Sequence, residues 1–239
     1  MSQYARRRIL PLLLLVLCTT IIAADGPASQ PIRIVLMGDS TVCDYPPASV
    51  TRGWGQFIAE GFSSPVLVHN FAVGGRSTKT FISEGRLKKA LEEPADFALI
   101  QFGHNDSHAK DHPEATDAAT DYRQNLKTCI GACLAAKVQP ILVTPMHRRT
   151  FKEGKLTTEL LPYANAMKAV AREKQISVID LYTLSGGLFE KLGNDASVDL
   201  NCTPTDHTHF SEKGARALAQ LILKELRTLD PRLQTAIRE

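Results

Sequence analysis

The sequence lacks a hydrophobic run long enough to cross a bilayer. Its most apolar stretch, residues 9–17, falls short of the roughly 20 residues that a transmembrane helix needs, and Pro11 interrupts it. Three arginines precede this stretch and small residues follow it. That order predicts a secretory signal peptide at residues 1–24, with an uncleaved anchor as the alternative. We therefore expect a secreted or periplasmic protein whose folded domain covers residues 25–239, with no membrane contact after cleavage.

Outside this segment the sequence also lacks an excess of charge of either sign. The full chain has 28 Lys and Arg against 25 Asp and Glu. The predicted leader holds three of the arginines and no acidic residue, so the remainder has 25 of each sign. Nucleic-acid-binding domains usually carry a basic surface, and this balance therefore gives no support for a nucleic-acid partner.

Cysteine is scarce, and its spacing resembles no zinc site. Beyond the leader the chain has only Cys43, Cys129, Cys133 and Cys202. Cys129 and Cys133 lie four residues apart in a helical pattern, which favours two small buried side chains. A disulfide between Cys43 and Cys202 is conceivable, but pairing cannot be read from sequence. We expect neither a metal nor a cofactor.

What the sequence does contain is a regular alternation of aliphatic runs and helical periodicity. The runs are continuous, as in parallel strands that are buried on both faces. Strands are predicted at residues 32–38, 66–70, 97–102, 140–145 and 176–181, and helices at 54–59, 77–91, 117–136, 158–174 and 211–226, with a short helix after 181. Strands separated by helices pair in parallel through right-handed crossovers. The predicted fold is a three-layer α/β/α sandwich with about five parallel strands in flavodoxin-like order. About 215 residues without a repeat or linker suit one such domain.

Polar turns follow three of the predicted strands. Ser40 follows the first strand, the Gly74-Gly75 turn follows the second, and Asn105 follows the third. The carboxyl ends of parallel strands share one edge of the sheet, where such folds bind ligands. We therefore expect these three turns to meet. Near the C-terminus, Asp206 and His209 are three residues apart, close enough to face the same pocket.

These residue types are those that ester hydrolysis requires. A serine hydroxyl is a poor nucleophile until a base accepts its proton, and His209 could do this for Ser40 with Asp206 fixing its tautomer. The oxyanion needs donors, which the N–H groups of Ser40 and Gly75 and the amide of Asn105 could supply. Each residue alone has an ordinary alternative as a helix cap, a turn residue or part of a loop.

Together the motifs resemble a known family. The segments Gly38-Asp39-Ser40, Gly75, Asn105 and Asp206-x-x-His209 match, in order, the four blocks of the SGNH (GDSL-like) hydrolases. Residues 53–55, 74–77, 84–86, 102–106 and 206–209 are similar to the rhamnogalacturonan acetylesterases of that family. The resemblance implies the SGNH hydrolase fold, with Ser40 as nucleophile, His209 as base and Asp206 as its partner. It also implies an oxyanion hole formed by Ser40, Gly75 and Asn105. The expected reaction is removal of acetyl groups from a plant cell-wall pectin, without a metal.

Arginines near the predicted rim could recognise the uronate carboxylates of such a polymer. Arg76 follows the oxyanion glycine, and Arg148 and Arg149 follow the fourth strand. A solvated basic loop is the alternative. Trp54 could stack on a sugar ring, although packing on the sheet is the favoured interpretation. The expected partner is an acetylated polysaccharide or oligosaccharide, and the expected oligomeric state is a monomer.

Other functions stay open at this point. A lipase or lysophospholipase of the same superfamily would need an acyl-chain groove, which the sequence does not identify, and another carbohydrate esterase would differ only in its polymer. A metal hydrolase could use Asp206, His207 and His209. A carbohydrate-binding protein without catalysis is the remaining alternative.

Overall fold

A computed structural model describes residues 30–238. The chain from Pro31 onward forms a compact unit of its own. The signal peptide predicted at residues 1–24 lies outside the described residues. Within residues 30–238, no helix has both the length and the apolar character needed to span a membrane.

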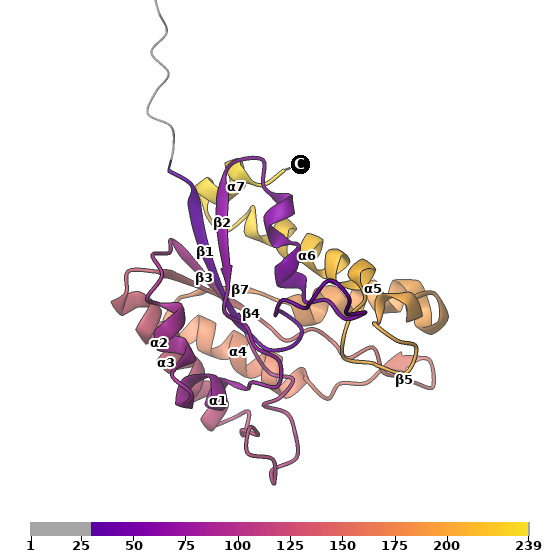
Figure 1. Cartoon of the computed structure of the whole chain (residues 1–239). Helices are drawn as coiled ribbons and strands as arrows, with labels where there is room; N and C mark the ends of the chain where they lie inside the picture. The colour runs from indigo at the N-terminus through magenta and orange to yellow at the C-terminus, as the bar shows by residue number, and fades with distance from the viewer. Residues whose placement is uncertain (1–29, 239) are drawn as a thin grey trace, which may run out of the picture. The chain divides into compact units, whose positions relative to one another are not determined.

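A five-stranded parallel sheet forms the centre of this unit (Figure 1). Its strands are β1 (Ile32–Gly38), β2 (Val66–Asn70), β3 (Phe97–Gln101), β4 (Gln139–Val143) and β7 (Ser177–Ile179). They lie in the order β2-β1-β3-β4-β7, and every neighbouring pair is parallel. This confirms the predicted α/β fold with five parallel strands in flavodoxin-like order.

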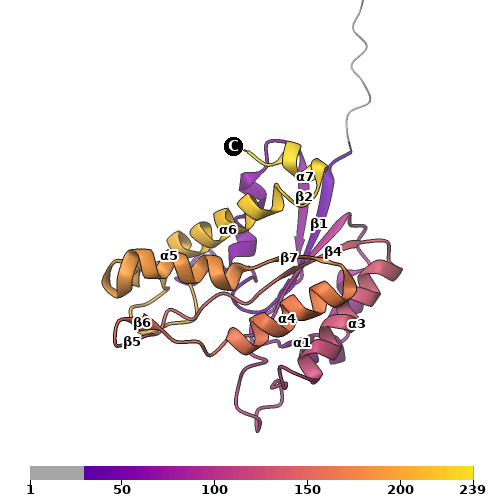
Figure 2. The ribbon, with the colours of Figure 1, turned by 180° about the vertical axis from the view of Figure 1, so that it is seen from behind.

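Helices cover both faces of the sheet, which makes three layers (Figures 1 and 2). One face carries α1 (Thr78–Ser83), α2 (Arg86–Ala90), α3 (Asp121–Ala135) and α4 (Leu161–Lys174). The other carries the 3₁₀ helices η1 (Trp54–Gln56) and η2 (Ile58–Gly61) together with α5 (Leu181–Ala196), α6 (Glu212–Leu226) and α7 (Pro231–Ala236). A third 3₁₀ helix, η3 (Val198–Leu200), precedes the loop that leads to α6.

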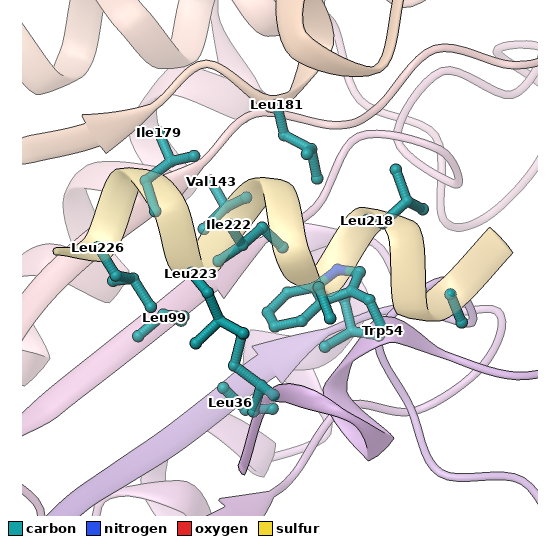
Figure 3. Close-up of a cluster of buried hydrophobic side chains, with 14 of the residues drawn as sticks. Leu36, Trp54, Leu99, Val143, Ile179, Leu181, Leu218, Ile222, Leu223 and Leu226 are labelled. Atoms are coloured by element: carbon teal, nitrogen blue, oxygen red, sulfur yellow. The ribbon is translucent and has the colours of Figure 1, made fainter. Parts of the chain in front are cut away.

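The helix α6 supplies much of the core on its face of the sheet (Figure 3). Its residues Leu218 and Ile222 are fully buried in the same cluster as Leu36 of β1. Burial of one such side chain contributes roughly 1.5–3 kcal/mol. The Ser211 hydroxyl accepts the Gly214 N–H at 3.2 Å and so caps the helix two residues after His209. The packing of α6 therefore fixes the segment that carries the predicted base.

Some predicted elements differ in detail. The helix expected over 77–91 is two short helices, because Gly85 between them has a φ of +73°, in the left-handed region that glycine favours. The segment 54–59 forms 3₁₀ turns rather than an α-helix. The hairpin of β5 (Phe151–Lys152) and β6 (Lys155–Leu156) and the helix α7 were not predicted, since each is too short to show a period.

Candidate active site

The chain makes a tight turn directly after β1, and Ser40 lies on it. The Asp39 carbonyl accepts the N–H groups of Val42 and Cys43 at 3.1 and 3.0 Å. A Cβ on Gly38 would lie 2.6 Å from the Val42 side chain, so only glycine fits at the end of the strand. The side chain of Tyr45 donates to the Ser40 carbonyl at 2.9 Å. The backbone of Ser40 is thus held from both sides.

His209 and Asp206 complete a hydrogen-bonded chain that starts at Ser40. The Ser40 Oγ lies 2.9 Å from His209 Nε2, and His209 Nδ1 lies 2.9 Å from Asp206 Oδ2. The other carboxylate oxygen of Asp206 accepts the N–H groups of Thr208 and His209, both at 2.8 Å. Burial alone would raise the pKa of Asp206, but these N–H donors and the His209 ring lower it to about 2. Asp206 is therefore ionised at any ordinary pH and can stabilise a protonated imidazole.

The loop that carries both residues is fastened at several points. The Asn201 side-chain amide donates to the Asp206 carbonyl. The Cys202 N–H donates to the His209 carbonyl at 3.0 Å, and the Arg149 N–H donates to the His207 carbonyl at 2.8 Å. This bonding positions the imidazole before a substrate arrives, which is what general-base catalysis requires.

Asn105 and the Gly74-Gly75 turn lie on the loops that follow β3 and β2. Hydrogen bonds from Val73 N–H to Gly38 O at 3.0 Å and from Arg76 N–H to Val73 O at 3.3 Å hold the glycine turn against the end of β1. A Cβ on Gly74 would lie 3.6 Å from the Ser40 Cβ, so this turn is next to the serine. Gly75 has a φ of +77°, and a Cβ there would meet nothing within 4 Å.

The Asn105 side chain is oriented by a single bond. Its Nδ2 donates to the Arg76 carbonyl at 3.1 Å, and Asn105 is only 7 % exposed. A side-chain amide nitrogen has two hydrogens, so one remains for a ligand. The second hydrogen of the Asn105 amide can therefore donate to a bound ligand.

Comparison with known proteins identifies the group to which this arrangement belongs. The model of the GDSL-like lipase/acylhydrolase family matches residues 36–217, which include every residue of the site described above. The chain belongs to this family. It is therefore a carboxylic ester hydrolase.

Two relatives of this GDSL-like hydrolase come from Bacillus subtilis. The chain is 37 % identical over 218 residues to the probable rhamnogalacturonan acetylesterase YesY, covering 87 % of this chain and 98 % of the relative. It is 39 % identical over 216 residues to the rhamnogalacturonan acetylesterase RhgT, covering 84 % and 91 %. These similarities confirm the predicted resemblance to rhamnogalacturonan acetylesterases.

Solved structures share the fold. The crystal structure of YxiM from Bacillus subtilis superposes with a TM-score of 0.73 at 30 % identity, covering 83 % of this chain but only 57 % of that one. The acetylxylan esterase Axe2 from Geobacillus stearothermophilus gives a TM-score of 0.64 at 17 % identity, covering 81 % of this chain and 93 % of that one. The second likeness shows the common fold alone.

A buried chain of side chains beneath Ser40 was not predicted from the sequence. Trp54 Nε1 donates to Gln101 Oε1 at 2.7 Å, and Gln101 Nε2 donates to Thr41 Oγ1 at 2.6 Å. The Thr41 hydroxyl donates in turn to Asp39 Oδ1 at 2.7 Å. Thr41 occupies the position where the name of the GDSL family has leucine. This threonine is the one feature of the sequence that could have indicated a polar side chain next to the nucleophile.

Asp39 also approaches a buried histidine. Its Oδ2 lies 3.6 Å from His104 Nδ1, and both side chains are almost completely buried. Burial opposes the charge on Asp39, but His104 and the two donors of Thr41 outweigh it and lower the pKa of the carboxyl. The carboxylate therefore anchors the turn that presents Ser40.

The structure excludes sugar contact for Trp54, in line with the packing favoured from the sequence, and shows that the prediction of Arg149 as a substrate-binding residue is wrong. Trp54 is fully buried, because its ring packs in the core between the sheet and α6, and it cannot stack on a sugar. Arg149 is 2 % exposed, and its guanidinium donates to Asn194 Oδ1 and to the Asn194 carbonyl, both at 2.9 Å. Arg149 therefore connects the loop after β4 to the end of α5, and its guanidinium is unavailable to a uronate.

The other two arginines remain near the site. The Arg76 guanidinium is engaged by Glu84 at 3.1 Å and by the Gly74 carbonyl at 3.0 Å. Arg148 donates to the Thr208 hydroxyl and, at 3.1 Å, to the His104 carbonyl. Arg148 lines an open pocket of about 700 Å³ beside His209. The pocket is lined entirely by polar residues, namely Arg148, Thr150, Glu159, Thr203, Thr205, Asp206, His207, Thr208 and His209.

The structure also tests the predictions for the cysteines and for a metal site that would include His207. Cys129 and Cys133 are buried, as predicted, and Cys43 and Cys202 are free thiols. His207 Nδ1 lies 3.1 Å from the Arg149 carbonyl. Among the described residues, the histidine and carboxylate groups close enough together to hold a metal do not include His207. The geometry therefore gives no support for a metal hydrolase built on Asp206, His207 and His209.

Proposed function

We propose that this protein is a serine esterase that removes acetyl groups from rhamnogalacturonan through Ser40, His209 and Asp206. The observation that carries the proposal is the contact of 2.9 Å between Ser40 Oγ and His209 Nε2, two atoms whose residues lie 169 positions apart in the sequence. The two Bacillus subtilis relatives named as rhamnogalacturonan acetylesterases support the choice of substrate.

The first half of the reaction forms an acetyl-enzyme. His209 Nε2 accepts the Ser40 proton while Oγ attacks the acetyl carbonyl carbon. The N–H groups of Ser40 and Gly75 and the Asn105 amide stabilise the negative oxygen of the tetrahedral intermediate. The protonated imidazole, held by ionised Asp206, then gives its proton to the departing sugar hydroxyl.

The second half releases acetate. A water molecule replaces the sugar, His209 accepts its proton, and the resulting hydroxide attacks the acetyl carbonyl. Collapse of the second tetrahedral intermediate breaks the bond to Ser40 Oγ, which recovers its proton from His209. The enzyme returns to its starting state with acetate and the deacetylated sugar as products.

The pocket next to His209 suits a carbohydrate better than a long acyl chain. Its lining has no aliphatic side chain, whereas a lipase needs an apolar groove for the chain. Arg148 has a planar guanidinium at this pocket, and such a group recognises a carboxylate through paired donors. These features support a polymer that contains uronate.

Acetate release from a panel of substrates tests the proposal. Wild type and Ser40→Ala are compared on acetylated rhamnogalacturonan, acetylated xylan, 4-nitrophenyl acetate and 4-nitrophenyl decanoate. The proposal predicts the highest kcat/KM on rhamnogalacturonan, negligible cleavage of the decanoate, and loss of all activity in Ser40→Ala. Preference for xylan or for the long chain would reject the substrate, and activity in Ser40→Ala would reject the nucleophile.

Arg148→Gln tests uronate recognition, with Arg123→Gln on α3 as a surface control. We expect kcat/KM to fall by about tenfold or more on rhamnogalacturonan, since a paired carboxylate contact is lost, and to change little on 4-nitrophenyl acetate. An equal loss on both substrates would show that Arg148 only supports the loop through Thr208 and His104. The control variant should match wild type on both.

We also propose that the protein acts outside the cytoplasm as a monomer, after removal of residues 1–24. The three arginines followed by the apolar stretch of residues 9–17 support export of the chain. Expression of the full chain followed by N-terminal sequencing of the exported protein would test this. A protein retained in the cells, with its original N-terminus, would contradict it.

A further inference from the structure

A second group of chemically active side chains lies on the loop that joins β3 to α3. His108 Nδ1 lies 2.6 Å from Glu114 Oε1, and His112 Nδ1 lies 3.4 Å from the same oxygen. The two imidazole rings approach edge to face, with centroids 5.4 Å apart. One donor atom from each of the three residues lies within 4.8 Å of the others. None of these residues belongs to the esterase site.

This donor set is one that zinc prefers. Two imidazole nitrogens and one carboxylate oxygen, with water as the fourth ligand, form a common tetrahedral arrangement with bonds of roughly 2.0–2.2 Å. Such bonds place neighbouring ligand atoms roughly 3.3 Å apart. The distance from His112 Nδ1 to the Glu114 oxygen already has that value. The distance from His108 Nδ1 to the same oxygen is shorter, and a small rotation of the His108 ring would lengthen it to the same value.

The three side chains are partly exposed, so an ion could reach them from solvent. The Glu114 side chain is only 16 % exposed, whereas those of His108 and His112 are 36 % and 54 % exposed. A glutamate carboxyl is ordinarily ionised at neutral pH and can offer an anionic oxygen to a cation. The carboxylate is therefore the least exposed of the three side chains, and the two more exposed rings can turn their nitrogens toward a cation.

The loop is fixed at its base, so its ligands need little further ordering. The Thr116 N–H and hydroxyl both bond to Asp106, at 3.0 and 2.9 Å. The Tyr163 hydroxyl donates to the carbonyls of Thr116 and Asp106 at 2.6 and 3.0 Å. The His108 N–H donates to the Asn105 carbonyl at 3.2 Å. The cluster is thus connected directly to the residue with the proposed oxyanion donor.

We propose that His108, His112 and Glu114 bind one zinc ion, and that the ion stabilises the loop that carries Asn105. The proposal does not depend on the identity of the ester substrate. It assigns no chemical step to the metal, because none of the three ligands lines the polar pocket beside His209.

Zinc titration of the metal-free full chain tests the proposal without any assay of ester hydrolysis. Calorimetry should give one ion per chain for wild type, and the Tm should rise with zinc concentration because only the folded state presents the three ligands together. His112→Gln and Glu114→Gln should each weaken binding by about tenfold or more and remove the rise in Tm. His112 is exposed, so its variant should fold normally.

His69→Gln is the matched control, since His69 is a partly exposed histidine on β2 whose Nδ1 lies 4.0 Å from Glu93. It should bind zinc as wild type does. Absence of binding by wild type would overturn the proposal, and so would equal binding by His112→Gln and Glu114→Gln. A loss in His69→Gln as large as that in His112→Gln would also overturn it, because binding would then be non-specific.

Discussion

Asp206 is the residue whose bonding explains most about the site. Its carboxylate accepts two backbone N–H groups and the His209 ring, and each of these bonds favours the charged form. The same three bonds hold the segment 206–209 in one conformation. Orientation of the base and charge stabilisation of its protonated form thus come from one side chain.

Asp206→Asn should therefore lose both activity and stability. We expect kcat to fall by about 10²–10⁴-fold, because an amide neither fixes the tautomer nor balances the imidazolium charge. The native pKa of about 2 lies below the ordinary value of 3.8, so the carboxylate stabilises the fold fully above pH 3.8 and ceases to do so as the pH falls through about 2. At pH 7 the variant should lose about 1 kcal/mol of unfolding free energy, since solvent screens part of the effect at this partly exposed side chain. Steady-state kinetics and urea denaturation measure the two losses, and wild-type kcat in the variant would contradict the role.

Asn105→Ala tests the oxyanion donor separately from the base. Removal of one preorganised donor typically lowers kcat by about 10²–10³-fold, while KM changes little because the donor acts mainly on the transition state. The measurement is kcat and KM on 4-nitrophenyl acetate. Asn165→Ala, on the exposed side of α4, is the control and should resemble wild type. A change confined to KM would indicate ground-state binding instead.

At the scale of elements, α6 connects core packing to catalysis. The helix begins with the Ser211 cap, and its Leu218 and Ile222 side chains are buried against the sheet. A Cβ on Gly214 would lie 2.0 Å from the Leu200 carbonyl oxygen, so the first turn of the helix also contacts the loop that precedes Asp206. The base is therefore placed by the same contacts that close the core.

Ser211→Ala should weaken the contact between the first turn of α6 and the loop that precedes it, without altering the chemistry. Loss of an N-cap hydroxyl costs about 1 kcal/mol, and urea denaturation should show that decrease in the unfolding free energy. We expect kcat to stay within a factor of two or so, since the loop retains its other bonds. Ser83→Ala, at an exposed position of α1, is the control. Equal stability of Ser211→Ala and wild type would show that the cap is not needed.

The loop after β3 is joined to α1 through a buried carboxyl. Asp106 contacts the Thr78 hydroxyl at 2.5 Å and the Thr116 hydroxyl at 2.9 Å. Burial raises the pKa of Asp106 to about 7, against the opposing effect of these donors. The folded state therefore keeps a proton that the unfolded chain loses above pH 3.8.

Stability should consequently fall as the pH rises from about 4 to about 7, because over that range the folded state binds more protons than the unfolded state. Asp106→Asn removes this titration while keeping an acceptor for both threonines. Its unfolding free energy should depend less on pH across the same range, by a few kcal/mol in total. Asp111→Asn, an exposed change on the same loop, should leave the wild-type slope. An unchanged slope in Asp106→Asn would refute the assignment.

At the scale of the whole molecule, the sequence predicted the sheet, its order and the residues that meet at its edge. Continuous aliphatic runs mark strands buried on both faces, and parallel strands bring Ser40, Gly75 and Asn105 to one side without further information. His209 was first proposed from its residue type and its spacing to Asp206, and the family resemblance strengthened that role, since a loop gives no periodic signal.

The same sequence could not show which side chains are buried. Arg149 was expected near substrate because it follows the fourth strand at the correct edge. For Trp54, sugar stacking was the less favoured alternative to packing. Both side chains are buried against partners far along the chain. Trp54 meets Gln101, and Arg149 meets Asn194. The cluster of His108, His112 and Glu114 was missed for the corresponding reason: an irregular loop brought the three together.

The central claim is that distant segments assemble an activated serine, and covalent labelling tests it most directly. The protein is treated with a serine-directed phosphonate, and the adduct is located by mass spectrometry of the intact chain and of its peptides. The account predicts one adduct per chain on Ser40, formed far more slowly in His209→Ala and absent in Ser40→Ala. Labelling of another residue, or ester hydrolysis by a chain that remains unlabelled at Ser40, would contradict it.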